Sequence, residues 1–532
     1  MTDDIAKHMR SNFAHLLAQA AIRFRDRDSI MYRGQATSFE ELARRAGEVA
    51  AALRAAGLRP GDACAISVRD PRDAVASYFA VLAAGGTAIN VNELYRPRQI
   101  EHLLRQSRAR LLLTTRDLLA EHQRSVVSDA TNFLLEDVPP SAEPFEPIER
   151  GPDDVAQIIF TSGSTGMPKG VVMSHSNLWA GVRVVANYLG LRGDDRIASV
   201  LPLSFVYGFN QLTTALFTGA TLVVERSTLA QEIIAMLRRE RITVLAAVPP
   251  LWQQLLAAPS FRDEPIDTLR IATNAGGRLP PASVIQLRSA QPQARLFLMY
   301  GLTEVFRSTY LAPEEVDAHP DSMGRAVPES TVYVVTEDGE EAAPGEIGEL
   351  VHGGPTVALG YVNDPEGTAR VFRKNPFAAR GSAAPDRVVY SGDLVRRDEA
   401  GRLFYVSRRD RMIKTLGFRV SPDEICDVIQ ASGMVAEAAV VSEPDAQRGE
   451  RIVACVVLKE GATVQQLRQF CGAELPRYMH PARYVPLAAI PRNGSGKHDI
   501  PVLRELVTAP RESGVTGQLD FSRPRPVGQR VD

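Results

Sequence analysis

The sequence predicts an α/β protein, with a large N-terminal domain of parallel or mixed sheets packed with helices and a smaller C-terminal α+β domain. At 532 residues the chain is too long for one ordinary hydrophobic core, so two or more domains are expected. Short apolar runs alternate with amphipathic stretches over most of the chain, which is typical of parallel sheets. The pattern changes near Thr331 and again near Arg408, where further structural units are expected to begin.

Buried strands are predicted at short aliphatic runs that polar or glycine-containing segments bound. These runs are Ala63–Val68, Leu111–Thr114, Ile158–Thr161, Ala198–Leu203, Thr221–Val224, Val244–Val248, Leu269–Ala272 and Leu296–Met299. The Ala/Leu/Arg-rich stretches between them are amphipathic and predict helices, for example over Phe39–Ala56 and Leu229–Arg241. The alternation favours helices packed on largely parallel sheets.

From Thr331 onward the pattern is that of a β-hairpin. Val332–Val335 and Gly348–His352 flank a turn at Asp338–Gly339. A strand over Leu403–Val406 comes later, and the charged quartet that follows it marks a boundary. We therefore predict an N-terminal domain over residues 1–409, a C-terminal domain over residues 410–508 and a Pro/Gly/Arg-rich disordered tail over residues 509–532.

Composition argues against several classes of protein. Lys and Arg number 61 and Asp and Glu 63, with no long basic run, so no nucleic-acid partner is expected. No apolar window is long enough for an integral membrane segment, and the first residues lack the apolar core of a signal peptide. The four cysteines, at positions 64, 426, 455 and 471, form neither a CxxC pair nor a metal pattern. They predict inert, buried thiols in a reducing compartment, and hence a cytoplasmic location.

The most informative local pattern is a glycine-rich loop that follows the apolar run Ile158–Phe160. The candidate phosphate-binding residues in it are Thr161, Ser162, Gly163, Ser164, Thr165, Gly166 and Lys169. The glycines allow a tight turn that presents N–H groups to phosphate oxygens, and the hydroxyls and the lysine add donors and a positive charge. The spacing fits neither a Walker A loop nor a nucleophile elbow. The alternative is a solvated Gly/Ser linker, although linkers rarely follow a strand directly.

This loop resembles the phosphate loop of the acyl-adenylate-forming superfamily, which includes acyl-CoA synthetases, peptide-synthetase adenylation domains and beetle luciferases. The resemblance covers about residues 10–507, and the other motifs occur in the family's order. They are Tyr300–Glu304, Gly348–Leu350 with Gly360–Tyr361 and Asp364–Pro365, Tyr390–Leu394, Arg408–Arg419 and Pro491–Lys497. Within the family, Met299–Leu311 and Ser204–Leu212 are most similar to bacterial acyl-CoA ligase-like enzymes found with biosynthetic gene clusters. The resemblance implies a barrel-like β part in the N-terminal domain and a mobile C-terminal domain.

The resemblance also implies roles at the triphosphate. Lys497 would bridge the carboxylate and the α-phosphate during adenylation, Thr303 would contact the α-phosphate, and Glu304 would bind Mg²⁺. The residue types suit these roles, because the reaction gathers negative charge and Mg²⁺ prefers oxygen ligands. The alternatives are an exposed turn lysine at position 497 and a helix-start carboxylate at position 304.

The nucleoside would be held by other residues. Asp393 would accept both ribose hydroxyls with Arg408 beside it, Tyr300 would stack on the adenine, and Gly276 and Gly277 would leave room for the base and the acyl chain. A turn aspartate and a simple glycine turn are the alternatives.

The C-terminal domain would serve two half-reactions by rotating about Asp410. Lys497 would then leave the site, and the loop from Lys414 to Gly417 would enter it, with Gly417 allowing pantetheine to pass close to the backbone. Lys414 fits a structural or surface role equally well. The sequence departs from the family pattern at Ser407, where glycine is usual before the hinge arginine, and at Cys426, where glutamate is usual.

The acyl pocket would be lined by Phe205, Val206, Tyr207 and Gly301. Amino-acid-activating relatives have aspartate at the position of Val206, where it pairs with the substrate ammonium. Valine cannot make that pair, and a buried unpaired ammonium costs several kcal/mol. The expected substrate is therefore a fatty, branched or aryl acid. The alternative is an amino group bound by some other side chain. Phe209 and Tyr207 fit either the pocket or the core.

The sequence thus predicts an ATP- and Mg²⁺-dependent acid–thiol ligase that forms an acyl-AMP and passes the acyl group to a thiol. The acceptor is coenzyme A or the phosphopantetheine of an acyl or peptidyl carrier protein, and the sequence leaves both open. A free-standing adenylation enzyme that loads an amino acid onto a carrier protein is the main alternative. A luciferase-type oxygenase, an inactive nucleotide-binding protein and a plain ATPase or kinase fit the motifs less well.

Overall fold

The computed structural model describes residues 11–93, 95, 97–122, 130–141, 143–161, 168–378, 385–415, 418–445, 449–493 and 496–508. The chain divides into two compact units. One comprises the residues up to Ser391 together with Arg396–Phe404, and the other comprises Gly392–Val395 and the residues from Tyr405 onward. The limits 1–409 and 410–508 stay a prediction, and the tail over 509–532 lies outside the described residues.

A first sheet in the large unit carries the ends of the glycine-rich loop. Its strand order is β18-β8-β7-β4-β3-β5-β6. The strands are β3 (Ala63–Ser67), β4 (Thr87–Asn90), β5 (Leu111–Thr114), β6 (Thr131–Leu134), β7 (Val155–Thr161), β8 (Lys169–Ser174) and β18 (Gly360–Tyr361). Pairing is parallel from β7 to β6 and antiparallel from β7 through β8 to β18. The sheet is therefore mixed, as predicted.

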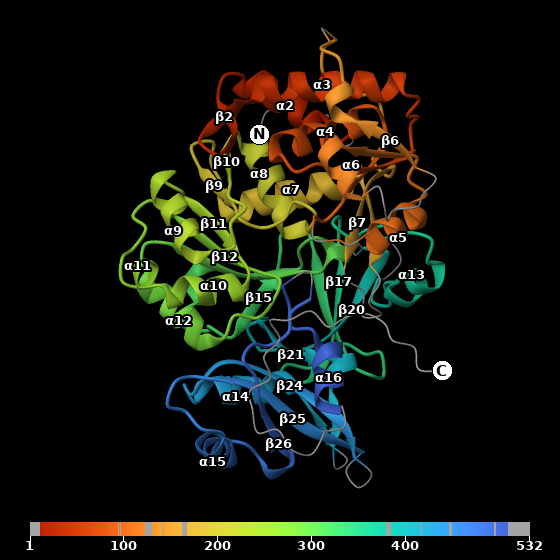
Figure 1. Cartoon of the computed structure of the whole chain (residues 1–532). Coiled ribbons are helices and arrows are strands. Elements are labelled where there is room, and N and C mark those ends of the chain that lie inside the picture. The colour runs from red at the N-terminus through yellow and green to blue at the C-terminus, as the bar shows by residue number, and fades with distance from the viewer. Residues whose placement is uncertain are drawn as a thin grey trace, which may run out of the picture. The chain divides into compact units, whose positions relative to one another are not determined.

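A second sheet begins with a parallel part, in the order β13-β12-β11-β9-β10-β1, and the antiparallel strand β2 follows β1. These strands are β1 (Asp28–Tyr32), β2 (Gln35–Ser38), β9 (Arg196–Ser199), β10 (Thr221–Val224), β11 (Val244–Ala247), β12 (Ile271–Asn274) and β13 (Arg295–Tyr300). Figure 1 shows α9, α10, α11 and α12 gathered beside β11 and β12. Their aliphatic side chains pack with those of β11 and β12 around Trp252 and Phe261, so this part has its own core.

The same sheet continues in the order β16-β17-β20-β21-β15-β14, and β19 pairs with β20. The pairs β13–β14, β14–β15, β15–β21, β16–β17 and β19–β20 are antiparallel. They are β14 (Thr309–Leu311), β15 (Ser322–Ala326), β16 (Thr331–Val335), β17 (Ile347–Gly353), β19 (Phe372–Lys374), β20 (Arg387–Arg397) and β21 (Leu403–Arg408). β16 and β17 pair antiparallel from Thr331 with Gly353 to Val335 with Glu349, and Gly339 turns the chain between them with φ of 87°. The predicted hairpin is confirmed.

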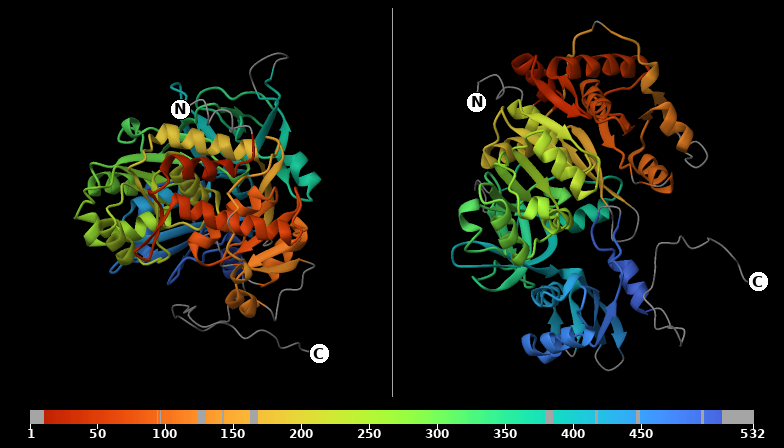
Figure 2. Two further views of the ribbon diagram at one scale, coloured as in Figure 1. Left: turned by 90° about the horizontal axis from the view of Figure 1, so that it is seen from above. Right: turned by 60° about the vertical axis from the view of Figure 1, so that its left-hand side comes forward.

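The helices of the large unit bury their apolar faces between and against the sheets. They are α2 (His15–Phe24), α3 (Phe39–Ala55), α4 (Pro71–Ala83), α5 (Pro97–Ser107), α6 (Arg116–His122), α7 (His175–Leu189), α8 (Val206–Thr218), α9 (Ala230–Arg239), α10 (Pro249–Ala257), α11 (Pro259–Arg262), α12 (Pro281–Ala290) and α13 (Pro365–Val371). Figure 2 shows α2 and α3, in red, next to each other. Short 3-10 turns are η1 (Leu135–Asp137), η2 (Thr303–Val305) and η3 (Pro313–Glu315).

Local sequence explains several helix ends. Ser38 accepts a hydrogen bond from the Glu41 N–H while the Glu41 side chain reaches back, which is a capping box at the start of α3. α7 begins with a similar box at Ser174 and ends at Gly190, whose φ of 63° is the left-handed conformation that glycine adopts most readily.

The C-terminal unit is a sheet with helices on both faces. The strand order is β23-β22-β25-β24, and β26 pairs in parallel with β25. Its elements are β22 (Ile413–Thr415), β23 (Phe418–Val420), β24 (Val435–Asp445), β25 (Gly449–Leu458), β26 (Arg483–Pro486), α14 (Pro422–Ala431), α15 (Val464–Glu474), α16 (Ile500–Thr508), η4 (Arg409–Arg411) and η5 (Arg477–Met479).

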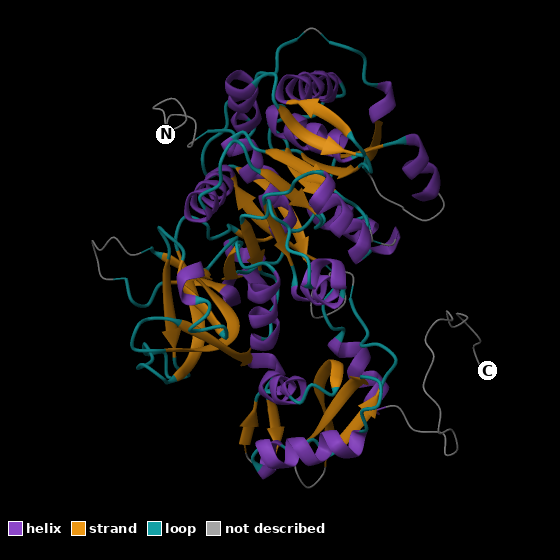
Figure 3. Cartoon of the chain, turned by 90° about the vertical axis from the view of Figure 1, so that its left-hand side faces the viewer, coloured by secondary structure: helices purple, strands orange, loops and turns teal. Residues whose placement is uncertain are grey.

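Alternate residues of β24 serve the two faces of this sheet, as the period of two requires. Val440 packs in the cluster with Ile425 and Leu467, whereas Val441 packs with Leu503 of α16. Figure 3 shows helices on either side of these strands. The predicted fold class, an α/β chain with a large N-terminal part and a smaller C-terminal α+β part, is confirmed.

Most of the predicted strands differ slightly in their limits from the structure, and two of them shift by two residues or more at both ends. The run Ala198–Leu203 is a strand only as far as Ser199, because the chain then turns at Pro202, whose carbonyl accepts a hydrogen bond from the Phe205 N–H at 3.2 Å. The run Leu269–Ala272 begins in a turn, where the Leu269 N–H donates to Ile266, and the strand is Ile271–Asn274. Among the described helices, none combines the length and the apolar character needed to cross a membrane.

Candidate functional site

The strands on either side of the glycine-rich loop form a tight antiparallel pair. Thr161 at the end of β7 lies opposite Lys169 at the start of β8, and Phe160 lies opposite Gly170. The sequence folds this way because aliphatic residues on both strands pack into the first sheet. The predicted loop residues Ser162, Gly163, Ser164, Thr165 and Gly166 lie outside the described residues.

Three predicted motifs meet beside this hairpin. The Tyr361 hydroxyl donates to Oε1 of Glu304 at 2.6 Å, and Nζ of Lys169 lies 5.7 Å from the centroid of the Tyr361 ring. Tyr361 reaches this position because β18 pairs with β8, Tyr361 opposite Val171. The structure thus brings both Lys169 and Glu304 next to one tyrosine, Lys169 near its ring and Glu304 at its hydroxyl. Tyr361 belongs to a family motif that is recognisable in the sequence, but the sequence predicted no role for it.

Four further segments follow the carboxyl ends of neighbouring parallel strands. β9, β11, β12 and β13 are adjacent and parallel, so the residues after Ser199, Ala247, Asn274 and Tyr300 emerge at one edge of the sheet. Ligands of open α/β sheets bind at this edge. The predicted acyl segment, the glycine pair and Tyr300–Glu304 therefore share one edge.

The glycine pair after β12 is a tight turn. Gly276 has φ of 79°, and a side chain there would lie 3.3 Å from Val248 after β11. The Asn274 side chain donates to the Gly277 carbonyl at 3.0 Å and so fixes the turn. Gly301 is also crowded, because an added Cβ would lie 3.0 Å from Cα of Arg307. Thr303 begins the short turn η2, directly before Glu304.

The predicted acyl segment leads into α8. Phe205 precedes the helix, Val206 is its first residue and is buried, and Gly208 must lack a side chain because a Cβ would lie 2.1 Å from the Pro202 carbonyl oxygen. The Tyr207 hydroxyl is 2.6 Å from the Thr273 hydroxyl and 2.9 Å from the Thr273 carbonyl oxygen, so it ties this segment to β12. Burial raises the pKa of Tyr207 well above its usual range.

Asp393 and Arg408 lie together in the C-terminal unit. Arg408 Nη1 donates to Asp393 Oδ1 at 3.0 Å, and the Asp393 side chain is almost fully buried whereas that of Arg408 is 38% exposed. Asp393 lies within β20 rather than in a turn, although the preceding Gly392 has φ of 72°. A Cβ on Gly392 would lie 3.2 Å from the Arg408 guanidinium, so glycine allows this close approach.

Lys497 is exposed on a turn near the end of the C-terminal unit. Its N–H donates to the Asn493 side chain at 3.1 Å, its carbonyl accepts from the Asn493 N–H at 2.8 Å, and Gly496 before it has φ of 77°. The hinge candidate Asp410 lies in η4 and Lys414 in β22, but their side chains are outside the described part, as is Gly417 altogether.

The two departures from the family pattern are buried or half-buried. Ser407 is buried in β21, and Cys426 on α14 has a pKa raised by burial. Burial also raises the pKa of Cys64 to about 12 and that of Cys455 to about 11. The prediction of inert thiols is consistent with these pKa values.

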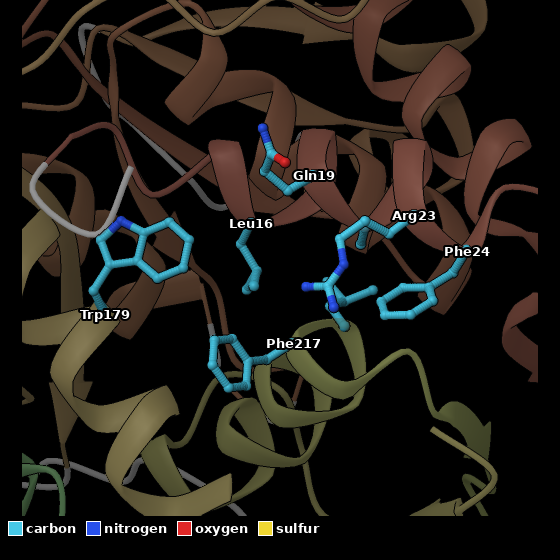
Figure 4. A pocket seen from close by; sticks show the side chains of 8 residues that line it. Leu16, Gln19, Arg23, Phe24, Trp179 and Phe217 are labelled. Atoms are coloured by element: carbon cyan, nitrogen blue, oxygen red, sulfur yellow. The ribbon is translucent and has the colours of Figure 1, made fainter. Parts of the chain in front are cut away.

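A small pocket between α2, α7 and α8 is separate from these residues. Leu16, Gln19 and Arg23 of α2 line it with Trp179 and Phe217 (Figure 4). Its volume is about 10 Å³, room for about one water molecule, so it cannot hold an acyl chain.

Comparison with known families decides the membership of the chain. The family described as AMP-binding enzyme matches residues 17–362, more than half of the chain, and the AMP-binding enzyme C-terminal domain matches residues 424–497. This chain belongs to the AMP-binding enzyme family. The predicted membership of the acyl-adenylate-forming superfamily is confirmed.

The curated relatives of this AMP-binding enzyme include a biosynthesis protein, a CoA ligase and a synthase, as their names state. Novobiocin biosynthesis protein H of Streptomyces niveus is 30% identical over 92% of this chain and 81% of its own length. A long-chain-fatty-acid–CoA ligase of Salmonella typhimurium is 29% identical over 91% of this chain and 93% of its own length. Tyrocidine synthase 3 of Brevibacillus parabrevis is 29% identical over 94% of this chain, which spans only 8% of that protein.

Solved structures extend the similarity to the fold. ATP-bound MatB from Rhodopseudomonas palustris superposes with a TM-score of 0.84 at 28% identity, over 93% of this chain and 98% of MatB. o-Succinylbenzoate CoA synthetase from Bacillus subtilis, in complex with its acyl-adenylate intermediate, superposes with a TM-score of 0.82 at 25% identity, over 94% and 99% of the two chains.

Proposed function

We propose that this AMP-binding enzyme activates a carboxylic acid with ATP, forming an acyl-AMP and pyrophosphate, and then transfers the acyl group to a thiol. In the first step a carboxylate oxygen attacks the α-phosphorus and pyrophosphate leaves. In the second step a thiolate attacks the acyl carbon and AMP leaves. The solved CoA synthetase with a bound acyl-adenylate supports this order of steps.

The observation that carries the proposal is the convergence of Lys169, Tyr361 and Glu304. A triphosphate with bound Mg²⁺ needs a cation for its phosphate oxygens and a carboxylate for its metal. The lysine next to the phosphate loop and the carboxylate held by a tyrosine provide these two groups. Lys169 would attract the phosphate oxygens, and Tyr361 would hold the Glu304 carboxylate in one orientation.

The residues present fit Mg²⁺ bound through a nucleotide. The described residues include no group of three or more His, Cys, Asp or Glu that could hold a metal by itself. Mg²⁺ on a nucleotide usually takes one or two carboxylates, with phosphate oxygens and water as its other ligands. Glu304 can keep the Tyr361 hydrogen bond on one oxygen and offer the other to the metal. The metal would neutralise charge that develops on the leaving pyrophosphate.

The C-terminal unit would supply the remaining groups. The Asp393 carboxylate, held by Arg408, suits the two ribose hydroxyls as a double acceptor. Lys497, on its exposed turn, would enter to neutralise the attacking carboxylate and the α-phosphate. Asp410 would be the hinge that removes Lys497 and brings Lys414 and Gly417 to the site for thiol transfer.

The acid is expected to lack an amino group at the α8 end of the pocket. Val206 offers no partner for an ammonium, and its burial makes an unpaired ammonium there costly. This supports fatty, branched or aryl acids over amino acids. The name of the Salmonella relative supports coenzyme A as the acceptor, and the tyrocidine synthase relative keeps the phosphopantetheine of a carrier protein open. The four free cysteines, largely buried, support a reducing cytoplasmic location.

Acid-dependent exchange of pyrophosphate into ATP tests the first step. We expect exchange with members of a panel of fatty, aryl and branched acids, its loss when Mg²⁺ is chelated, and thioester formation when coenzyme A or a carrier protein is added. Glu304→Gln should lower exchange by about tenfold or more, because a neutral amide is a poor Mg²⁺ ligand. Glu314→Gln, at a surface glutamate that is 68% exposed, is the matched control. No exchange with any acid would rule out the proposal.

A further inference from the structure

An arginine is buried directly after the nucleotide motif. Arg307 is 3% exposed and follows η2 by two residues. Between them Phe306 has φ of 59° and ψ of −59°, a backbone conformation that is strained for a bulky residue. The Phe306 ring fixes this turn, because it packs so closely on α7 that a Cβ at Gly181 would lie 2.6 Å from it. Strain of this kind persists where it positions a functional group.

The guanidinium of Arg307 lies against the predicted acyl segment. Its central carbon is 4.9 Å from the centroid of the Tyr207 ring. Tyr207 lies one residue after Val206 on α8, and its hydroxyl is bound to Thr273. The Arg307 backbone is also next to the nucleotide motif, since the Ser308 N–H donates to the Tyr300 carbonyl at 3.0 Å. Arg307 therefore belongs to the acyl side of the same sheet edge.

The positive charge of Arg307 has no counter-ion in the described chain. No Asp or Glu among the described residues pairs with it, and its Nε and Nη2 atoms are buried with no hydrogen-bond partner there. The nearby tyrosines do not neutralise it, because burial raises the pKa of Tyr188 to about 12 and that of Tyr207 further, so both hydroxyls stay protonated. The charge of Arg307 lowers both pKa values, but by less than burial raises them. Arginine stays charged at any physiological pH.

Other buried polar atoms near this point also lack partners within the described ranges. The Ser308 hydroxyl is fully buried next to Arg307 in the chain, and Asn210 and Gln211 follow Tyr207 by three and four residues, on the same face of α8. The Asn210 Nδ2, Gln211 Oε1 and Ser308 Oγ atoms have no partner there. Such groups are rare in folded proteins because each costs free energy, so several on these two segments indicate a site that water or a ligand completes.

The unpartnered atoms of Arg307 define the chemistry of such a ligand. Nε–H and Nη2–H form one edge of the guanidinium and point in parallel, which is the geometry that binds the two oxygens of a carboxylate. An ammonium would be repelled by Arg307, in agreement with Val206, which precedes Tyr207 on α8 and offers an ammonium no partner. A purely aliphatic chain would leave the charge buried and unpaired.

We propose that the acid activated by this enzyme is a dicarboxylic acid, whose second carboxylate binds the Nε/Nη2 edge of Arg307. This inference rests on the proposed function and narrows it. The reacting carboxylate would lie towards Thr303 and the nucleotide, and the second would lie in the plane of the Arg307 guanidinium, beyond its Nε/Nη2 edge. The expected substrate class therefore differs from a plain fatty acid by a second anionic end.

Matched pairs of acids test this inference in pyrophosphate release. Each pair has the same carbon chain and differs by one carboxylate, such as butanoate with succinate and hexanoate with adipate, and aryl pairs are included. We expect the wild-type enzyme to favour one diacid over its partner by at least about tenfold in kcat/KM. Arg307→Met should lower the diacid kcat/KM by about 100-fold and leave the monoacid value unchanged or higher, because methionine keeps much of the volume without the charge. Arg295→Met, at an exposed arginine of β13, is the control.

Thermal unfolding separates a ligand role from a structural one. Arg307→Met without ligand should unfold at the same temperature as wild type or higher, since a buried unpaired charge is removed, and the diacid should raise the unfolding temperature of wild type only. Where Arg307→Met does not fold, Arg307→Lys keeps the charge but lacks the Nε/Nη2 edge of the guanidinium. This variant should lose most of the diacid preference. Equal loss with both acids, or an unchanged diacid preference, would overturn the inference and leave the ligase activity standing. Absence of release with every acid would instead remove the proposed function.

Discussion

Removing one hydroxyl group should test whether Tyr361 orients Glu304 for catalysis. Tyr361→Phe deletes the donor of the 2.6 Å hydrogen bond to Glu304. It keeps the ring, which packs edge-on against Phe372 with centroids 5.4 Å apart and lies below Lys169. The change therefore removes a single interaction and creates no cavity.

The size of the effect follows from the type of hydrogen bond. A hydrogen bond to a charged group contributes about 1.5–3 kcal/mol, and the partial exposure of Tyr361 and Glu304 favours the lower end. A loss of about 1.5 kcal/mol corresponds to a decrease of about tenfold in rate. We expect kcat/KM for ATP to fall by about this factor, with a higher Mg²⁺ concentration needed for half-maximal exchange.

Pyrophosphate exchange measured over a series of Mg²⁺ concentrations provides the assay. Tyr333→Phe is the control, because it deletes a neutral hydrogen bond of 3.3 Å from Asn375 in the β16–β17 region. If Tyr361→Phe and Tyr333→Phe behaved alike, with normal Mg²⁺ dependence, the hydrogen bond to Glu304 would have no part in nucleotide binding.

Three other perturbations probe different parts of the chain. Lys497→Ala should reduce acyl-AMP formation by about 100-fold or more and spare thioester formation from preformed acyl-AMP, and equal loss in both assays would contradict its assignment to one half-reaction. Asp195→Ala should lower the free energy of unfolding by about 3–5 kcal/mol in denaturant titrations, because it leaves the Arg270 guanidinium without its buried partner; a change below about 1 kcal/mol would refute this. Burial lowers the pKa of His175 to about 4, below the value of 6.5 in the unfolded chain, so the unfolded chain binds the extra proton and stability falls as the pH drops from 6.5 towards 4. His175→Asn should make this fall shallower in unfolding experiments across that range, whereas an unchanged slope would mean that other groups cause it.

Much of the fold could be predicted because burial leaves a local signature. Leu111–Thr114 and Thr221–Val224 have the same limits in the sequence pattern and in the structure. The run Ala198–Leu203 was predicted too long, because an apolar pattern indicates burial without indicating the backbone conformation. The chain turns at Pro202, where Gly208 approaches the Pro202 carbonyl closely. Both residues of this contact lie after the end of the strand, so the apolar pattern of the strand does not indicate it.

The candidate site was predicted less completely, because its geometry depends on contacts distant in sequence. The motifs around Lys169 and Glu304 were recognisable, but the hydrogen bond from Tyr361 joins residues 57 positions apart. Arg307 was missed as a site residue, since an isolated arginine between a phenylalanine and a serine predicts nothing about burial. Its position follows from the backbone at Phe306 and from packing on α7, which neither periodicity nor residue type encodes.

The pairing of β18 with β8 determines how late in synthesis the first sheet of the large unit can finish folding. β8 starts at Lys169, whereas the strand that covers its outer edge is Gly360–Tyr361, so about 190 further residues must leave the ribosome before that edge is closed. Until then the nascent chain carries an open strand edge beside its phosphate loop, the kind of surface on which aggregation begins. Fragments that stop short of residue 360 should therefore need chaperones even though most of the large unit has already been made.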